Sequence, residues 1–264
     1  MSRTFDELRS AEASRAQLVS DSLNMRPLFF STRRSARVVG CALVLAAALS
    51  WLAAGYDIGE LRALSGGEAA ALGTAAKLAH AEAGRRIAIA QVACAVLVAA
   101  LFVPWLYQAR ANLRALGTRR LRFGREWTYL AFAIPLLNAY RPYQVVSEIW
   151  RGSDPSCTDP LGWQRVHTSP LVLAWWVGLA AWVSFELISA LLLYFAPGIQ
   201  HVEIAHALAF AGDVGAAASA SLGYFVVARI SAAQDAKWAA FGLGDQALLH
   251  PETARARPSA FGVV

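Results

Sequence analysis

Four long apolar runs dominate the chain, and shorter polar segments separate them. The runs occupy residues 38–55, 87–107, 171–195 and 204–228. The hydrocarbon core of a bilayer takes about 20 apolar residues to cross as a helix, so each run predicts a transmembrane helix. Helix formers continue after the second run as far as Gly117. This pattern predicts that the second helix extends beyond the membrane and ends at that glycine.

A fifth apolar run, residues 127–140, is shorter and contains Pro135 and Asn138. Its length is typical of a re-entrant or interfacial segment rather than a crossing. Pro142 suits the first turn of a new helix, which we expect to end near Gly152. The periodicity of this helix predicts an amphipathic element in the membrane interface. Its apolar face holds Tyr143, Val146, Ile149 and Trp150, and its polar face holds Gln144, Ser147, Glu148 and Arg151.

The predicted fold class is therefore all-α. We expect an integral membrane helical bundle of four transmembrane helices, with a short re-entrant or interfacial segment and an amphipathic interfacial helix. Its segments are a cytoplasmic N-terminal arm (1–37), a first transmembrane helix (38–55), an outer loop with an Ala-rich helix (56–86), a membrane domain (87–237) and a cytoplasmic C-terminal tail (238–264).

Composition agrees with this class, because 57% of the 264 residues are hydrophobic and only 16% are charged. An ordinary soluble domain carries more charge than this. The formal net charge of +6 comes from basic residues that lie beside the predicted spans. There they orient the helices and meet anionic lipid headgroups. We therefore expect the lipid bilayer, and not nucleic acid, as the partner of these charges.

The distribution of basic residues predicts the orientation. With the N-terminus inside and four crossings, 20 of the 24 Lys and Arg residues face the cytoplasm. The four that face outward are Arg62, Lys77, Arg85 and Arg86. Because short basic loops stay inside, this count predicts a cytoplasmic-membrane protein with both termini in the cytoplasm. About 37 residues precede the first run, which predicts a retained anchor rather than a cleaved signal peptide.

Glu186 and Asp213 are the carboxylates deepest in the predicted spans. If the last two spans are adjacent and antiparallel, both residues lie roughly 14 Å from the outer end and can meet. Two carboxylates in low dielectric cannot both ionise cheaply, so the pair is a candidate proton or cation site. The alternative interpretation is structural. Each carboxyl group is then protonated or forms a hydrogen bond with a nearby hydroxyl, such as that of Ser184, Ser189, Ser219 or Tyr224, and holds neighbouring helices together.

The sequence gives little support for a metal site, a redox site or a catalytic site. His201, Glu203 and His206 are spaced so that both histidines do not share one helical face, and the three cysteines have no metal or redox spacing. The common catalytic signatures are absent from the sequence. We therefore expect no metal, no cofactor and no enzymatic activity. Gly215, Ser219 and Gly223 recur every four residues, which predicts a face for close helix packing.

The middle of the chain resembles a known family. The segments YQARANLRALG, LRF, IPLLNAYRPYQVVSEIW and RGSDP are similar to the bacterial membrane family called domain of unknown function 4328. The resemblance covers residues 98–237, although the family usually has a Pro-Gly pair where this chain has Arg125 and Glu126. It implies a multi-pass membrane protein and brings no established activity. The matching positions form a candidate headgroup-binding or structural motif: Asn112, Arg122, Phe123, Trp127, Pro135, Asn138, Arg141, Pro142, Tyr143, Gln144 and Trp150.

Three functions fit these observations. A membrane interaction or scaffold protein needs the fewest assumptions; it would associate with itself as a homo-oligomer or with other membrane proteins. The alternative is a small proton- or cation-coupled transporter or channel component that uses Glu186 and Asp213. An enzyme would instead bind its substrate near Asn138, Arg141 and Tyr143, where Arg141 could hold a phosphate or a headgroup.

Overall fold

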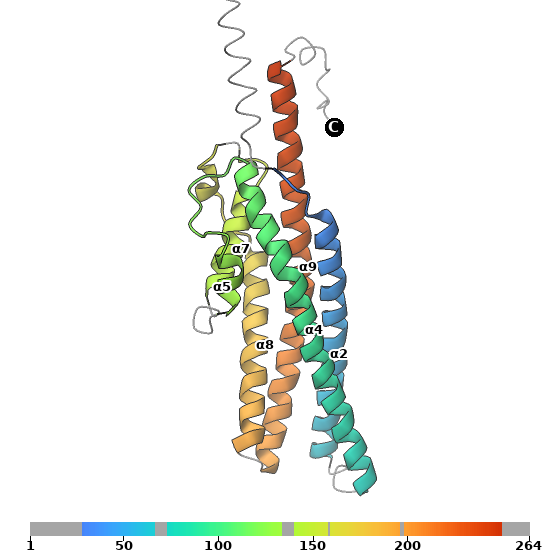
Figure 1. Ribbon diagram of the computed structural model, residues 1–264. Coiled ribbons are helices and arrows are strands. Elements are labelled where there is room, and N and C mark those ends of the chain that lie inside the picture. Colours follow the sequence, from blue (N-terminus) through green and yellow to red (C-terminus); the bar gives the residue numbers. More distant parts are fainter. Residues whose placement is uncertain (1–27, 67–72, 134–139, 158, 196–197, 250–264) are drawn as a thin grey trace, which may run out of the picture.

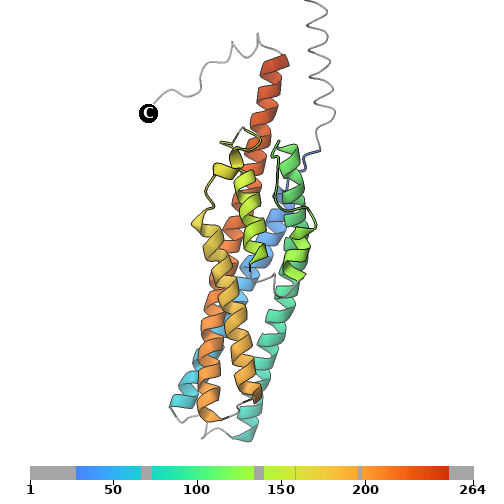
Figure 2. The same cartoon turned by 90° about the vertical axis from the view of Figure 1, so that its left-hand side faces the viewer.

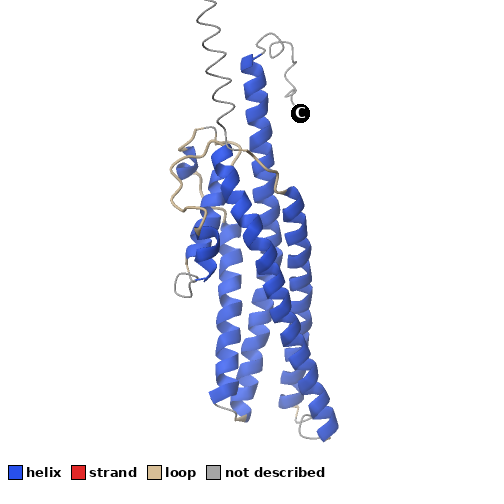
Figure 3. Ribbon diagram, in the orientation of Figure 1, coloured by secondary structure: helices blue, strands red, loops and turns tan. Residues whose placement is uncertain are grey.

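The computed structural model describes residues 28–66, 73–133, 140–157, 159–195 and 198–249. Within these residues the chain is helical, with loops and no strand (Figure 3). The prediction of an all-α bundle is confirmed. Its helices are α2 (Arg33–Ser65), α4 (Thr74–Ala115), α5 (Trp127–Ala133), α7 (Arg141–Gly152), α8 (Pro170–Phe195) and α9 (Ile199–Leu249), with a 3-10 turn η1 (Gly162–Arg165).

The four long helices α2, α4, α8 and α9 are each long and apolar enough to cross a membrane. Each contains one of the predicted runs. Helices α2, α4 and α9 extend well beyond their runs because helix formers continue past the apolar stretch, while α8 has nearly the predicted bounds. The helix α4 ends at Ala115, two residues before Gly117, whose φ of +74° is the left-handed conformation that closes a helix as predicted.

The order of packing is not the order of the chain. Helix α9 packs against α2 on one side and α8 on the other, and α2 in turn packs against α4. Among the described helices, α4 and α8 share no comparable interface and form the two edges of the bundle (Figure 2). We call the end at which α2 and α8 finish and α4 and α9 begin the hairpin end. The opposite end, which carries α5, α7 and η1, is the cap end (Figure 1).

The surface of the long helices is apolar. Large hydrophobic side chains point outward from all four, including Trp51, Val92, Val96, Val177 and Leu187. Polar residues such as Ser50, Asp57 and Asp213 are instead buried between the helices. This arrangement suits an apolar surrounding, where exposed hydrophobic side chains cost nothing and polar groups need partners. The structure thus supports a membrane-spanning bundle.

Small residues let α8 and α9 approach closely, as the spacing of Gly215, Ser219 and Gly223 predicted. A Cβ atom at Gly178 of α8 would lie 3.1 Å from the Ser219 Cβ and 3.2 Å from the Gly215 carbonyl oxygen. The Ser219 hydroxyl donates to the Trp175 carbonyl oxygen at 3.1 Å. The two helices therefore touch through their backbones at this level.

At the cap end, the boundaries of α7 match the prediction, but the exposure of its polar face does not. Helix α7 begins with Pro142 in its first turn and ends at Gly152, as predicted. However, Ser147 and Glu148, which we expected on a solvated polar face, are 4% and 1% exposed. The reason is that α4 and the segment after it supply polar partners for Glu148. Of the predicted interfacial run, α5 covers Trp127–Ala133, and Pro135 and Asn138 lie outside the described residues.

Candidate functional site

Four titratable side chains gather in the hairpin half of the bundle. They are Asp57 of α2, Glu186 of α8, and His206 and Asp213 of α9, which we call the acid–imidazole cluster. The Nδ1 atom of His206 lies 2.8 Å from the Asp57 Oδ1 atom, and the two side chains are 21% and 10% exposed. A carboxylate thus meets an imidazole inside the apolar part of the bundle.

Asp213 lies at the centre of the cluster and is 2% exposed. The amide Nε2 of Gln91, from α4, donates to its Oδ1 atom at 2.5 Å. The Asp213 carboxyl group also interacts with those of Asp57 and Glu186. Each of the four long helices therefore contributes a polar side chain to the surroundings of Asp213.

Glu186 reaches the cluster because α9 has a glycine opposite it. A Cβ atom at Gly212 would lie 3.2 Å from the Glu186 Oε1 atom, so a larger residue would push the carboxyl group away. The predicted antiparallel register of α8 and α9 thus places Glu186 beside the turn of α9 that carries Asp213. The role that the sequence suggested for this pair stays a prediction.

A second acid–imidazole pair lies closer to the hairpin end. The His80 Nδ1 atom is 2.8 Å from the Glu60 Oε1 atom, and these side chains are 59% and 19% exposed. The Tyr56 hydroxyl donates to the His80 carbonyl oxygen at 3.1 Å. Glu60 follows Asp57 by three residues, so both lie on one face of α2. Acid and imidazole groups therefore continue from the buried cluster toward the exposed end of the helices.

The cluster carries more acidic than basic groups. It combines three carboxyl groups with one imidazole, and no lysine or arginine in the described part of the chain forms an ion pair with them. Removing each ionised carboxylate from water costs several kcal/mol unless an opposite charge compensates it. Three negative charges cannot be held by one imidazolium. The arrangement therefore needs a proton or a cation.

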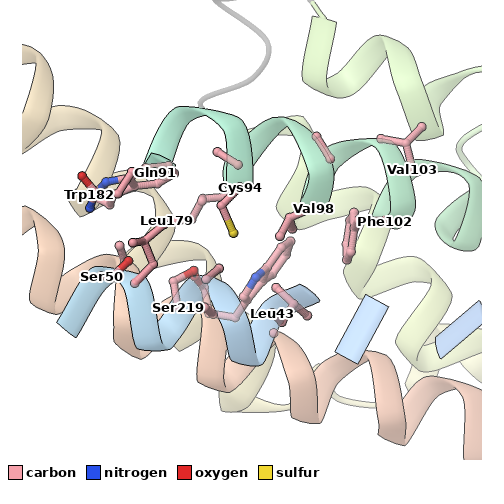
Figure 4. A pocket seen from close by; sticks show the side chains of 18 residues that line it. Leu43, Ser50, Gln91, Cys94, Val98, Phe102, Val103, Leu179, Trp182 and Ser219 are labelled. Carbon is pink, nitrogen blue, oxygen red and sulfur yellow. The ribbon is translucent and has the colours of Figure 1, made fainter. Parts of the chain in front are cut away.

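A cavity of about 270 Å³ adjoins the cluster on the side of the cap end. We call it the α4–α8 cavity, because those two edge helices flank it. Figure 4 shows Cys94 and Val98 of α4 across from Leu43 and Ser50 of α2, with Leu179 of α8 beside them. Its walls are mostly apolar, and Gln91, the donor to Asp213, also lines it. The cavity and the cluster therefore share a wall.

The motif at the cap end forms a different kind of site. Asn112 is fully buried and joins three parts of the chain. Its amide nitrogen donates to the Phe30 carbonyl oxygen at 2.8 Å and to the Gln234 Oε1 atom at 3.0 Å. The Gln234 amide donates in turn to the Ala109 carbonyl oxygen at 2.8 Å. Asn112 and Gln234 thus fasten the N-terminal segment, α4 and α9 together.

Arg141 lies among aromatic rings. Its guanidinium carbon is 5.2 Å from the centroid of Trp127 and 5.6 Å from that of Phe123, and an Nη atom donates to the Gln144 side chain at 3.2 Å. These contacts hold α5 and α7 together through cation–π interactions. Tyr143 and Trp150 pack against the hydrophobic core, and Pro142 starts α7. The described part of this motif therefore builds the cap.

A buried ion pair completes the cap. The Arg110 Nη2 and Glu148 Oε1 atoms are 3.5 Å apart, and both side chains are 2% exposed. Burial raises the pKa of Glu148, while the backbone N–H groups of Arg122 and Phe123 and the Arg110 charge oppose that rise. Arg110 also donates to the Phe123 carbonyl oxygen. Glu148 therefore fixes the loop after α4 to helix α7.

The sequence missed half of the acid–imidazole cluster. Asp57 lies two residues beyond the run predicted as the first span, and it was assigned to the outer loop. Its position seven residues after Ser50, on the same face of a continuing helix, is the signal that could have placed it inside. His206 was considered only as a metal ligand, and no group of metal-binding side chains occurs among the described residues.

Comparison with known families gives one match. The family model described as Domain of unknown function (DUF4328) matches residues 68–232, which is more than half of the chain. The match confirms the resemblance and begins earlier than the residues that suggested it, so it includes all of α4. No curated protein and no solved structure matches the chain.

Proposed function

The chain belongs to the family described as Domain of unknown function (DUF4328), and we propose that it is a small proton- or cation-coupled membrane transporter, or a component of one. The observation that carries this proposal is that Asp57 and Glu186 lie near Asp213 within the spanning helices, with His206 paired to Asp57. Ionisable residues inside a membrane bundle are costly, and they commonly mark pathways for protons or ions.

The excess of carboxyl groups decides which charge the site accepts. Asp57 and His206 form one pair, which leaves Asp213 and Glu186 without a cationic partner among the described residues. Two neighbouring carboxyl groups in a low dielectric favour a shared proton or a bound cation. Release of that proton requires a path to water, and the pair of Glu60 and His80 offers acceptors toward the hairpin end.

We also propose that the cap end lies in the cytoplasm and that the membrane is the bacterial cytoplasmic membrane. The basic residues of the bundle concentrate at the cap end, where α2 begins and α9 ends. Short basic segments stay on the cytoplasmic side. In this orientation the acid–imidazole cluster lies in the outer half of the membrane.

The scaffold function that the sequence favoured stays a prediction, as do homo-oligomerisation, other membrane partners and the absence of enzymatic activity. The polar cluster favours transport over a scaffold, because a scaffold has no need for uncompensated carboxyl groups in its interior. The motif around Arg141 gives little support to a headgroup site, since aromatic rings and Gln144 already surround that side chain.

Proton and cation flux into liposomes tests the proposal. The purified wild type is compared with the Asp213→Asn and Asp57→Asn variants, each of which removes one charge from the cluster. The matched control is Asp235→Asn, the same substitution on the same helix α9. Asp235 lies at the cap end, where it pairs with Arg33 at 2.5 Å.

We expect flux in the wild type and in Asp235→Asn, and its loss in both cluster variants. Equal flux in wild-type and empty liposomes would refute the proposal. So would flux that survives in both cluster variants while they remain folded. The Glu186→Gln variant extends the test to α8 and is also expected to reduce flux.

A further inference from the structure

We propose that the α4–α8 cavity binds a small organic cation, an amine or quaternary ammonium with an apolar body, whose charge points toward the acid–imidazole cluster. This inference rests on the proposed function, since it assigns a substrate class to the same carboxyl groups. Three observations support it. The carboxyl groups lie one helical turn beyond the residues that line the cavity, polar groups in the cavity wall lack a partner among the described residues, and the rest of the wall is aromatic and apolar.

The cluster closes the cavity at the side of the hairpin end. On α8, Trp182 lines the cavity and Glu186 follows one helical turn further out. On α9, Ala216 lines the cavity and Asp213 lies one turn further out. A ligand in the cavity therefore has carboxyl groups at one of its ends.

Two polar groups in the wall belong to buried residues and have no hydrogen-bond partner among the residues that the structure describes. The Ser50 hydroxyl is on a residue only 6% exposed, it lines the cavity, and none of the described residues forms a hydrogen bond with it. Figure 4 shows Ser50 among the lining side chains, on the same side as Ser219. The indole N–H of Trp175, a residue 5% exposed, is likewise without an acceptor in the described part of the chain. Neither atom is among the fully buried side-chain atoms that lack a partner, so both border the cavity itself. The Ser50 hydroxyl oxygen can accept a hydrogen bond from an ammonium N–H, whereas the indole N–H is a donor and does not pair with a cation.

The remaining wall suits an apolar body beside a positive charge. Phe102, Trp175 and Trp182 give the cavity three aromatic side chains. Aromatic faces attract ammonium groups as well as apolar ones. A volume of about 270 Å³ lies near the lower limit for ligand sites, which favours a small molecule. Carboxyl groups without basic partners exclude an anion from the same place.

The cavity also has a route of entry. It lies between α4 and α8, the two edge helices, which share no extensive interface within the described residues. An amphipathic cation partitions into the membrane interface and can enter sideways between these helices. An apolar lipid tail could use the same route, so the experiment must separate charge from hydrophobicity.

Binding of benzyltrimethylammonium to the full chain in nanodiscs provides this separation. The matched probe is neopentylbenzene, which has the same shape with a neutral carbon in place of the charged nitrogen. Equilibrium dialysis measures both probes, with empty nanodiscs as the blank. We expect the cation to bind more tightly than the neutral probe, and Asp213→Asn to weaken cation binding by about tenfold or more, because a charge pair in a low dielectric is lost. If Asp213→Asn does not fold, Glu186→Gln removes a second charge from the same site.

The location is tested with a matched pair of cysteine variants. Cys94 lines the cavity, whereas Cys41 of α2 is exposed on the outer surface of the bundle. Cys94→Phe fills the cavity and should abolish binding of the cation, while Cys41→Phe should leave it unchanged. Binding that survives Cys94→Phe would place the ligand elsewhere and overturn the inference.

Other outcomes also overturn it. Equal affinity for the two probes, unaffected by Asp213→Asn, would make the cavity a site for apolar molecules such as lipid tails. No binding of the cation by the wild type would refute the inference directly. Proton flux measured on the same preparation keeps the two proposals apart: flux without cation binding would leave the proposed function standing and remove only this substrate class.

Discussion

The two ends of the bundle treat their buried polar groups differently. At the cap end, Asn112 and Gln234 form a network in which each amide has partners, and Glu148 is paired with Arg110. At the hairpin end, Asp213 and Glu186 have no basic partner among the described residues, and Ser50 faces a cavity. The cap also holds buried atoms without a hydrogen-bond partner among the described residues, namely Arg110 Nε and Nη1, Arg125 Nε and the Ser147 hydroxyl. The two ends therefore differ in charge: the buried carboxylate of the cap has a basic partner, and the carboxyl groups of Asp213 and Glu186 do not.

This difference suggests a division of labour between the ends. Hydrogen-bonded amides and paired charges make a structure rigid and specific, whereas carboxyl groups without a basic partner are costly inside a membrane bundle and persist where they serve binding or transport. The polar contacts of the cap therefore stabilise the fold, whereas the unpaired carboxyl groups of the hairpin half destabilise it and serve function. Substitutions at the two ends should have opposite profiles, with large losses of stability at the cap and large losses of flux or binding at the cluster.

Removing the buried carboxylate of the cap should cause the largest loss of stability. Glu148→Leu leaves the Arg110 charge buried without compensation, which typically costs about 3–5 kcal/mol. The free energy of unfolding in mixed detergent micelles measures the loss. The control is Glu82→Leu, because Glu82 forms its ion pairs with the exposed Arg85 and Arg86, and it should show little change. Equal stability of the two variants would show that the buried ion pair of the cap stabilises the fold no more than an exposed one does.

The next largest loss of stability is expected at Gly178, where α8 and α9 are in close contact. Gly178→Ala brings a Cβ atom within 3.2 Å of the Gly215 carbonyl oxygen, and a backbone atom cannot move aside easily. We expect a net loss of about 1–2 kcal/mol in the free energy of unfolding, since overpacking outweighs the gain in helix propensity. The matched control is Gly59→Ala in α2, where no atom lies within 4 Å and stability should not fall. A stabilised Gly178→Ala variant would contradict the tight contact.

The sequence predicted the helices better than the cluster because the two depend on different ranges of interaction. Apolar length and helix formers are local properties, so the four spans, the end of α4 and the bounds of α7 could be predicted. Glu186 and Asp213 belong to consecutive helices, and counting residues from the turn was enough to place them side by side. Asp57 joins them through the packing of α2 against α9, and Gln91 through the approach of α4 to α9. Neither contact follows from counting residues around a single turn.

The same limit explains the error at the cap. Glu148 has the spacing of a solvated polar face, and Arg110 has the position of a basic residue at a membrane boundary. Only tertiary contact brings these two side chains together, with the backbone N–H of Arg122 donating to Glu148 at 2.7 Å. Periodicity shows which residues share a face but not what covers that face.

A single buried hydroxyl at the cap should have a smaller but measurable effect. The Ser231 hydroxyl oxygen accepts hydrogen bonds from the Trp105 indole N–H at 3.0 Å and from the Thr32 hydroxyl at 2.9 Å. Ser231→Ala leaves both donors unsatisfied, and hydrogen bonds of this kind contribute about 1 kcal/mol in membrane bundles. We expect a loss of that size in the free energy of unfolding. No loss would mean that the cap is less tightly organised than its contacts indicate.

A pH series sharpens the role of Glu148. Because burial raises its pKa in the folded chain above the ordinary value of 4.5, the folded state binds a proton more readily than the unfolded state. The stability from this group is therefore fully present below pH 4.5 and is lost as the pH rises through the raised folded pKa. We expect the wild type to lose stability relative to Glu148→Gln over that interval. An opposite slope would show that Arg110 and the N–H donors outweigh burial.

The smallest effect is expected at Ser50, the counterpart of Ser231 at the other end of the comparison. Both are serines in long apolar helices and both are buried, at 6% and 2% exposure. Ser50 has no partner among the described residues, so Ser50→Ala removes no hydrogen bond within the protein and should leave the free energy of unfolding nearly unchanged. Its consequence should appear instead in weaker binding of benzylammonium, whose N–H groups can donate to this hydroxyl. A loss of stability as large as that of Ser231→Ala would show that the Ser50 hydroxyl stabilises the fold. The contrast between a hydrogen-bonded serine at the cap and a free one in the cavity wall would then fail.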